Sequence, residues 1–273
     1  MNLVLPLREE VVGSRGHIKV SENLKIKNIG RDLNKIMANK IDKEIQGIIN
    51  NYEAVIKTID KKAKKDKKRA YGGILRAAIG DLVQNGIAKK LILVAWILLE
   101  KNPKRISFSS ERIKIPIKKE YIEKIESPVI KKFLLDNIDK CWYGQKTDLH
   151  VFIDGKFVMA IECKTYTENA MMKRILVDFT LLKEVYPNLD CVLFQLENQL
   201  GGDYSNLGDI TLGSFSTHTL LSFFNIDILI ITLLQGERRV DQPIHIPEYY
   251  KPLPKESLYK AIQTFKELLE KYE

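Results

Sequence analysis

Two apolar runs joined by an Asp-Gly pair constrain the fold of this chain more than any other feature of its sequence. Residues 148–153 and 157–164 each have the length and composition of a β-strand, and the Asp154-Gly155 pair between them is a strong hairpin signal. The first run opens with an acidic residue, and the second closes with an acidic and a basic residue. Charged groups beside apolar strands need partners or a chemical task, because removing a charge from water is unfavourable.

The charged residues at the end of the second run share one face of the expected strand. Side chains two residues apart in a strand point the same way, so Glu162 and Lys164 project together. Val158 and Ala160 lie ahead of them on that face, whereas Cys163 points to the opposite one. The pattern therefore predicts a carboxylate and an ammonium side by side at the end of an apolar strand.

The position of Asp148 depends on the register of the hairpin. If the turn has strictly two residues, Ile153 pairs with Lys156, and Asp148 then faces Ile161. To bring Asp148 opposite Glu162, the hairpin needs one extra residue, either in a three-residue loop with a bulge or in a bulge near Asp148. We therefore predict an irregularity of this kind.

The rest of the chain predicts an α/β fold with a mixed central β-sheet flanked by helices. After the hairpin we expect a helix over 168–185 with Thr167 as its N-cap, apolar strands over 190–196 and 225–234, and a closing helix over 255–272. Strands that are apolar throughout fit a sheet that is covered on both faces.

The part before the hairpin has mainly helical periodicity. We expect helices over 31–68 and 72–101, the second broken near Asn85-Gly86, then extended segments within 105–117 and helices within 118–140, one beginning at Pro128 after Ser127. We therefore divide the chain into a mainly helical N-terminal region, 1–140, and a core region, 141–273.

The chain is basic, with 44 lysines and arginines against 35 acidic residues and a formal net charge of +9. This balance suits a polyanionic partner such as nucleic acid, although many soluble proteins share it. The lysine-rich run Lys61–Arg69 has two interpretations: a solvated helix face or mobile loop, or a set of phosphate contacts. The sequence leaves both open.

Other features exclude several classes of protein. Three cysteines without a CxxC pair indicate reduced thiols, and without a signal-like start they predict a cytoplasmic protein. The longest apolar stretch, Leu91–Leu99, is too short to span a membrane. The four histidines lack zinc-site spacing, and the glycine-rich loop 201–213 lacks the ending of a phosphate-binding loop, so we expect neither zinc nor a nucleotide cofactor.

Two acids and one lysine supply the groups that phosphodiester hydrolysis needs. Asp148 and Glu162 can hold one or two magnesium ions through carboxylate oxygens. Such an ion polarises a phosphate and lowers the pKa of a bound water. Lys164 can hold that water, help to deprotonate it, or offset charge that develops on phosphorus. The alternative is structural, because an acid at a strand start and a Glu/Lys pair at a strand end are also common surface features.

The order of Asp148, a hairpin, Glu162-Cys163-Lys164, a helix and an apolar strand resembles the PD-(D/E)XK nuclease superfamily over residues 140–235. This resemblance implies a mixed sheet flanked by helices, Mg2+ as the usual cofactor, catalytic roles for Asp148, Glu162 and Lys164, and metal binding by the two acids. The chain departs from the pattern at Thr147, where proline is usual.

The segment after the motif is similar to type II restriction endonucleases, and faintly to the branch that cuts sites with CCGG cores. The similarity implies that the helix faces DNA through Asn169, Lys173 and Arg174, with Arg174 on guanine and Asn169 on adenine or phosphate. The alternative is a solvated helix face. A helical acid, Asp81 or Glu100, can complete the metal site as it does in some relatives.

The resemblance implies a type II restriction endonuclease that hydrolyses double-stranded DNA at a specific, palindromic site. We expect a homodimer with one active site per DNA strand, in which the region 1–140 supplies dimer contacts, DNA contacts or both. One alternative is another nuclease of the superfamily, such as a repair or junction-cutting enzyme. The other is a non-catalytic DNA-binding protein that uses the lysine-rich helix.

Overall fold

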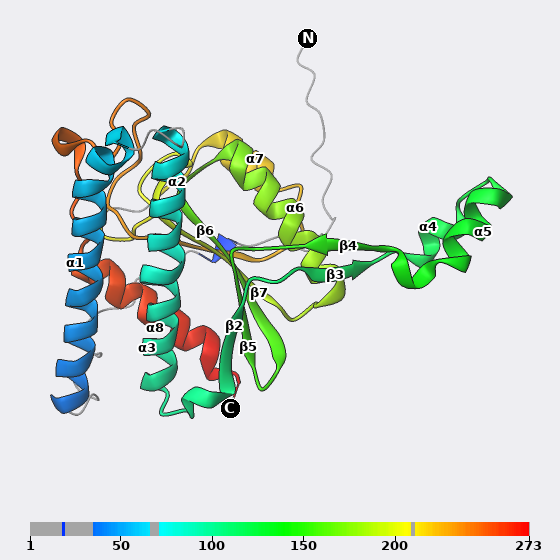
Figure 1. The fold of residues 1–273 in the computed structure, drawn as a ribbon, viewed down its shortest axis with the longest axis horizontal. Coiled ribbons are helices and arrows are strands. Elements are labelled where there is room, and N and C mark those ends of the chain that lie inside the picture. Colours follow the sequence, from blue (N-terminus) through cyan, green and yellow to red (C-terminus); the bar gives the residue numbers. More distant parts are fainter. Residues whose placement is uncertain (1–17, 20–34, 66–70, 209–210, 273) are drawn as a thin grey trace, which may run out of the picture.

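A six-stranded mixed sheet forms the centre of the computed structural model, which describes residues 18–19, 35–65, 71–208 and 211–272 (Figure 1). The strand order is β1 (Ile18–Lys19), β8 (Ile228–Thr232), β7 (Asp190–Gln199), β6 (Lys156–Glu168), β5 (Leu149–Ile153) and β2 (Ile106–Ser109). The first four strands are parallel to one another, and β5 and β2 each pair antiparallel with their neighbours. The expected α/β class with a mixed sheet is confirmed.

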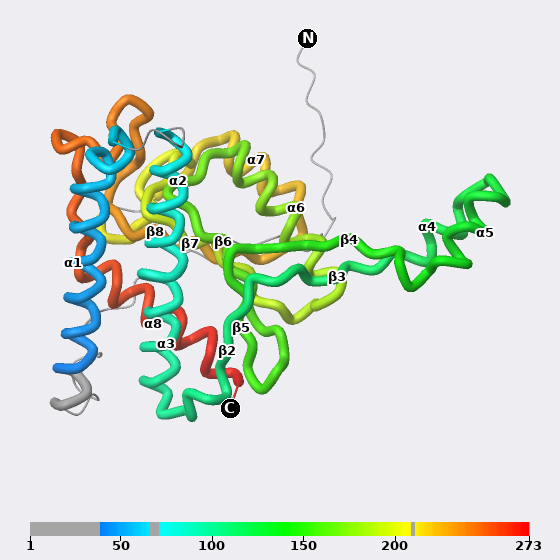
Figure 2. The backbone as a smooth tube through the Cα atoms, viewed as in Figure 1, coloured from blue at the N-terminus to red at the C-terminus, as the bar shows by residue number. Residues whose placement is uncertain are grey.

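Helices cover both faces of this sheet (Figures 1 and 2). On one face lie α1 (Lys35–Lys65), α3 (Lys89–Leu98) and α8 (Lys255–Glu270), and on the other α6 (Asn169–Val185) and α7 (Phe215–Leu221). Phe194 of β7 is buried in the first layer with Trp96 and Phe265, while Leu193 is buried in the second with Phe179. Burial on both faces explains the apolar run from Cys191 to Phe194 in β7 and from Ile228 to Ile231 in β8. No described helix is long and apolar enough to cross a membrane.

The N-terminal part of the chain shares this core. Strand β2 pairs with β5 at the sheet edge, with Ile106 opposite Ile153, and α1 and α3 contribute to the same buried cluster as the strands. Of the lysine-rich run, the part up to Lys65 continues α1, and residues 66–69 lie outside the described residues. Residues on both sides of residue 140 therefore pack in one core.

A π-helical segment, Leu82–Ala88, joins α2 (Tyr71–Asp81) to α3 without a break. The expected break near Asn85-Gly86 is therefore wrong. A Cβ atom on Gly86 would lie 3.1 Å from the Asn51 Nδ2 atom of α1, so glycine permits a close approach of two helices here. The glycine reflects a packing requirement, and the helix continues through it with a wider turn.

The β5–β6 hairpin contains the predicted irregularity. Asp154 and Gly155 both have positive φ, 50° and 75°, as a two-residue type I′ turn requires. Phe152 pairs with Phe157, but Val151 pairs with Met159, so Val158 is the extra residue of a β-bulge. The prediction of an extra residue is confirmed, although it lies in the middle of the hairpin and not in the loop or beside Asp148.

The bulge changes which side chains share a face. Val158 packs in the same buried cluster as Met159 and Ile161, so the expectation that it shares a face with Glu162 is wrong. Ala160 packs in the cluster on the α6 side. Beyond the bulge Leu149 is opposite Ile161, which brings the preceding residue, Asp148, level with Glu162.

A two-stranded ribbon, β3 (Ile113–Pro116) and β4 (Trp142–Gln145), carries α4 (Lys119–Glu123) and α5 (Pro128–Asp136) away from the body of the molecule (Figures 1 and 2). As expected, α5 begins at Pro128, and the Ser127 Oγ atom accepts a hydrogen bond from the Ile130 amide at 3.4 Å. The expected cap at Thr167 is wrong, because β6 continues to Glu168 and Thr167 is buried within it.

We predict that Gly155→Val lowers the free energy of unfolding by about 1–2 kcal/mol, since the left-handed backbone conformation is unfavourable for a β-branched residue. Space is not the obstacle, because no atom lies within 4 Å of the position that a Cβ atom would take at Gly155. Urea unfolding followed by circular dichroism measures the change. The matched control is Gly155→Asn, which tolerates positive φ. Equal losses in both variants would contradict the assignment.

Candidate active site

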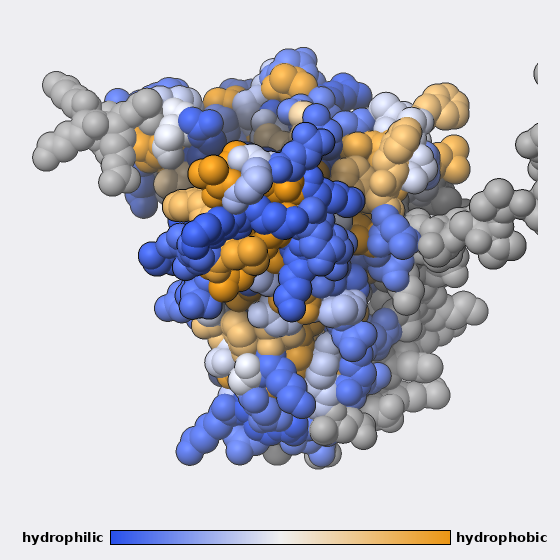
Figure 3. Space-filling view, turned by 90° about the vertical axis from the view of Figure 1, so that its right-hand side faces the viewer, coloured by the Kyte–Doolittle hydropathy of each residue, from blue (hydrophilic) through white to orange (hydrophobic). Residues whose placement is uncertain are grey.

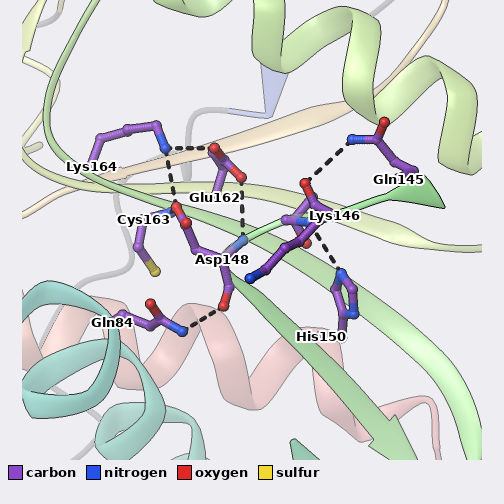
Figure 4. A network of polar contacts seen from close by, with 9 residues as sticks. Gln84, Gln145, Lys146, Asp148, His150, Glu162, Cys163 and Lys164 are labelled. Atoms are coloured by element: carbon purple, nitrogen blue, oxygen red, sulfur yellow. Dashed lines mark hydrogen bonds and ion pairs between the residues drawn. The ribbon is translucent and has the colours of Figure 1, made fainter. Parts of the chain in front are cut away.

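Three charged side chains converge where β5 begins and β6 nears its end (Figure 4). The Lys164 Nζ atom lies 2.5 Å from the Glu162 Oε1 atom and 3.1 Å from the Asp148 Oδ2 atom. The Asp148 amide donates a hydrogen bond to the Glu162 Oε2 atom at 3.4 Å. The structure therefore brings together all three residues that the sequence singled out, with the ammonium between two carboxylates.

Contacts from two directions fix the position of Asp148. The Cys163 amide donates to the Asp148 Oδ2 atom at 2.9 Å, which ties the side chain to β6. The Gln84 Nε2 atom donates to the Asp148 carbonyl oxygen at 2.5 Å, which ties the main chain to the π-helical segment. Sequence reasoning missed Gln84, because no local pattern links it to a residue 64 positions away.

Burial and charge act in opposite directions on this cluster. The Glu162 side chain is 9% exposed, against 25% for Lys164. Burial raises the pKa of Glu162, opposed by Lys164 and reinforced by the charge of Asp148. For Lys164, burial lowers the pKa, but the two carboxylates outweigh it, so that its pKa is raised. Two carboxylates with one ammonium leave one negative charge in excess, which suits a divalent cation.

The donor set of the cluster fits a hard metal ion. Magnesium prefers oxygen ligands and is commonly held by one or two carboxylates, with water and substrate phosphate in the remaining positions. No group of three or more His, Cys, Asp or Glu side chains able to hold a metal occurs among the described residues. Neither Asp81 nor Glu100 therefore joins Asp148 and Glu162, and the Asp81 carboxylate instead accepts a hydrogen bond from Asn85 at 2.7 Å.

Cys163 lies between the two motif residues but belongs to the opposite face of the sheet. Its side chain is buried in the cluster that contains Ile161. Burial raises the pKa of the Cys163 thiol well above its usual value, and burial raises that of Cys191 to about 12. Both groups are therefore unreactive thiols within the core.

Polar side chains extend along the same face as Glu162 and Lys164. Gln195 pairs with Lys164 across β6 and β7, is buried, and donates from Nε2 to the Thr232 Oγ1 atom at 3.0 Å. His150 is also fully buried, and its Nε2 atom accepts a hydrogen bond from the Thr147 amide at 3.2 Å. These residues escaped sequence reasoning because they lie within runs that are otherwise apolar.

Helix α6 begins directly after β6 and presents a basic surface. Lys173 and Arg174 are exposed on its first two turns. Asn169 is differently placed, because its Nδ2 atom donates to the Ser216 Oγ atom and its Oδ1 atom accepts from the Thr217 Oγ1 atom, both at 2.8 Å. Both ends of the Asn169 amide thus join α6 to α7.

Comparison with known proteins gives one strong likeness. The chain is 48% identical over 233 residues to the type II restriction enzyme DdeI of Desulfomicrobium norvegicum. The aligned residues make up 84% of this chain and 97% of that protein. No family model matches. Among solved structures, a chain of the native BbvCI A2B2 tetramer aligns with a TM-score of 0.33 and 13% identity, over 88% of this chain and 98% of that one. That structural likeness is too low to support further conclusions.

We predict that Lys164→Met lowers the free energy of unfolding by an amount on the order of 3 kcal/mol in metal-free buffer, because it leaves a buried carboxylate without its cation. Adding Glu162→Gln to this variant restores much of the loss, since the uncompensated charge is then gone. Urea unfolding of the two single variants and the double variant gives the coupling. Purely additive losses would show that the pair is not energetically linked.

The exposed ion pair between Lys132 and Asp136, 2.7 Å apart, is the matched control. Its side chains are 76% and 55% exposed. The corresponding Lys132→Met and Asp136→Asn cycle is expected to show no measurable coupling, because solvent screens exposed pairs.

Proposed function

We propose that this chain, which belongs to the type II restriction enzymes, cuts each DNA strand at the cluster of Asp148, Glu162 and Lys164. Membership follows from the 48% identity over most of both proteins, and it makes the chain a site-specific deoxyribonuclease that acts on DNA. The observation that supports the position of the active site is a single ammonium within 3.1 Å of two carboxylates, one on β6 and the other directly before β5. The same identity favours a restriction enzyme over the two alternatives, a repair or junction-cutting nuclease and a non-catalytic DNA-binding protein.

We propose Mg2+ as the cofactor, held by carboxylate oxygens of Asp148 and Glu162. When bound there, the ion would polarise the scissile phosphate and lower the pKa of a water molecule. The excess negative charge of the cluster and its oxygen donors support this assignment. The protein itself contributes rigid placement of both acids, through the Cys163 amide and through Gln84.

Lys164 is proposed to act as a hydrogen-bond donor at the reacting phosphate. Its ammonium already donates to both carboxylates, so it lies where a water held beside them would be within reach. A charged donor fixed in a partly buried site can orient the attacking water and offset negative charge that develops on phosphorus. The contacts of Lys164 favour these two roles over removal of a proton from water.

The exposed basic residues of α6 are proposed to contact DNA. Lys173 supplies a point charge for phosphate, and Arg174 supplies a planar fork that matches the acceptor edge of guanine. Asn169 can read a base only if it exchanges its bonds to Ser216 and Thr217. We therefore assign direct contact first to Lys173 and Arg174, and a bracing role to Asn169.

A homodimer acting at a palindromic site is the proposed assembly. Each chain contributes one cluster of two acids and a lysine, whereas cutting both strands of a duplex requires two reactions. A two-fold dimer on a two-fold site places one cluster at each strand. Within each chain, we propose that residues 141–273 carry catalysis and that the region 1–140 supplies dimer and DNA contacts.

We predict that wild-type protein converts a sequenced plasmid into discrete fragments with Mg2+ and that Asp148→Ala reduces the cleavage rate by about 100-fold or more, the scale for losing one charge-stabilising group. Gel-shift affinity of the variant for DNA is retained or increased, because an acid that repels phosphate is gone. Asp241→Ala, an exposed acid, is the control and should cleave normally. Undiminished cleavage by Asp148→Ala would remove Asp148 from the site.

We also predict that Arg174→Ala weakens DNA binding by about 10- to 100-fold, the range for loss of a bidentate base contact. Titration in a gel-shift assay at fixed salt measures this. The matched control is Lys43→Ala, which removes an exposed cation of α1 over the opposite face of the sheet. If both variants lose affinity equally, the effect reflects overall charge and α6 does not face DNA.

A further inference from the structure

An arm, residues 117–143, projects from the body of the molecule (Figure 1). It carries large hydrophobic side chains that the rest of the described chain leaves uncovered. Helix α5 has no buried residue. Figure 3 views the molecule from the side on which the arm projects, and hydrophobic groups gather there between charged ones. The exposed set consists of Tyr121 (58%), Val129 (78%), Ile130 (53%), Phe133 (63%), Leu135 (54%), Ile138 (42%), Trp142 (44%) and Tyr143 (62%).

The arm has its own small internal packing, so its shape does not depend on that exposed set. Ile122 of α4 is buried, and Leu134 of α5 is partly buried. Val129 and Phe133 are four residues apart on α5, so they form one apolar stripe on the outer side of the helix. An exposed apolar stripe on a helix is typical of a surface that binds another protein.

The charge of the arm points to a protein partner and away from DNA. Residues 118–140 contain six lysines and five acids, close to neutral, whereas the whole chain carries +9. A surface for the DNA backbone needs an excess of lysine or arginine, because phosphate neutralisation supplies the affinity. Aromatic and aliphatic groups with few unbalanced charges are typical of the centre of a protein interface.

The size of the surface is that of a substantial part of a stable interface. A fully buried aromatic side chain contributes about 150–250 Å². The four aromatic residues of the set, each roughly half exposed, therefore offer on the order of 400 Å², and the four aliphatic ones add to the about 800 Å² that each partner contributes to a standard interface. Because its charge is nearly balanced, two copies of the patch can meet without net repulsion, as a two-fold contact between identical chains requires.

We propose that the arm packs against a second copy of this chain and holds the homodimer together. The inference rests on the proposed function, which needs two active sites for one duplex. Strand β4 leads from the arm to Asp148 over only two intervening residues, since it ends at Gln145. A partner held by the arm is thus connected by a short, extended path to the catalytic cluster, and the arm contact sets the spacing of the two clusters.

The test is the mass of the protein in solution, measured by analytical ultracentrifugation at tens of micromolar. Wild-type protein is expected at twice the 31.5 kDa of one chain, and the variant combining Val129→Asp and Phe133→Lys at the mass of one chain. Both positions are exposed, so the variant is expected to keep the wild-type circular dichroism spectrum and melting temperature. Phe223→Lys changes an 80% exposed side chain outside the arm and should leave the dimer intact.

A second variant keeps the proposal testable if those substitutions perturb the tip. Residues 118–140 can be replaced by a short glycine-containing turn, because Pro116 and Trp142 already pair at the end of the ribbon and Ile117 donates to the Cys141 carbonyl oxygen at 2.9 Å. This variant is also expected to be a monomer. A monomeric wild-type protein, or arm variants that keep the wild-type mass, would overturn the proposal.

Different measurements test the arm and the proposed active site. Asp148→Ala lies outside the arm and is expected to keep the mass of the dimer whether or not it cleaves DNA. If Asp148→Ala cleaves normally while the arm variants are monomeric, the catalytic assignment is wrong and the arm assignment stands. If Asp148→Ala is inactive while the arm variants remain dimeric, the arm assignment is wrong and the catalytic one stands.

Discussion

The register of one hairpin decides whether Asp148, Glu162 and Lys164 form one cluster at all. A strict two-residue turn followed by regular pairing would set Asp148 opposite Ile161, and the two acids would lie on different faces of the sheet. The turn is indeed a two-residue type I′ turn, and the bulge at Val158 adds the residue that brings Asp148 level with Glu162. The contacts that join Asp148 to Glu162, Cys163 and Lys164 follow from that single irregularity.

The electrostatics of the cluster depend on where it lies in the fold. Helices cover both faces of β6, so the Glu162 side chain is almost completely shielded from water. Lys164 is the group that compensates its charge. The π-helical segment reaches the same point from the N-terminal part of the chain and holds the Asp148 carbonyl through Gln84. The N-terminal helices and the hairpin therefore meet at the proposed active site, although they lie far apart in the sequence.

Features that depend on neighbouring residues could be predicted from the sequence, whereas features that depend on contacts between distant residues could not. Strands and helices with local periodicity were predictable, and so was the bulge, because two acids that must meet impose a residue count on the hairpin. The continuous helix through Gly86 was not, since the glycine there is needed for the close approach of Asn51 on another helix. The role of Gln84 could not be predicted either, because its partner Asp148 lies far away in the sequence. The sequence of α5 also does not show whether its apolar stripe faces the core or the solvent.

The bulge has a consequence for how such a chain can change over generations. In a hairpin, gaining or losing one residue reverses the face of every side chain beyond that point. A bulge is a place where such a change can be absorbed, so the stretch around Val158 can tolerate a one-codon deletion that elsewhere in the two strands would separate Asp148 from Glu162. The tip of the arm carries no such constraint. Changes in chain length among descendants of this protein should therefore accumulate at the tip of the arm, where they leave the proposed active site unchanged.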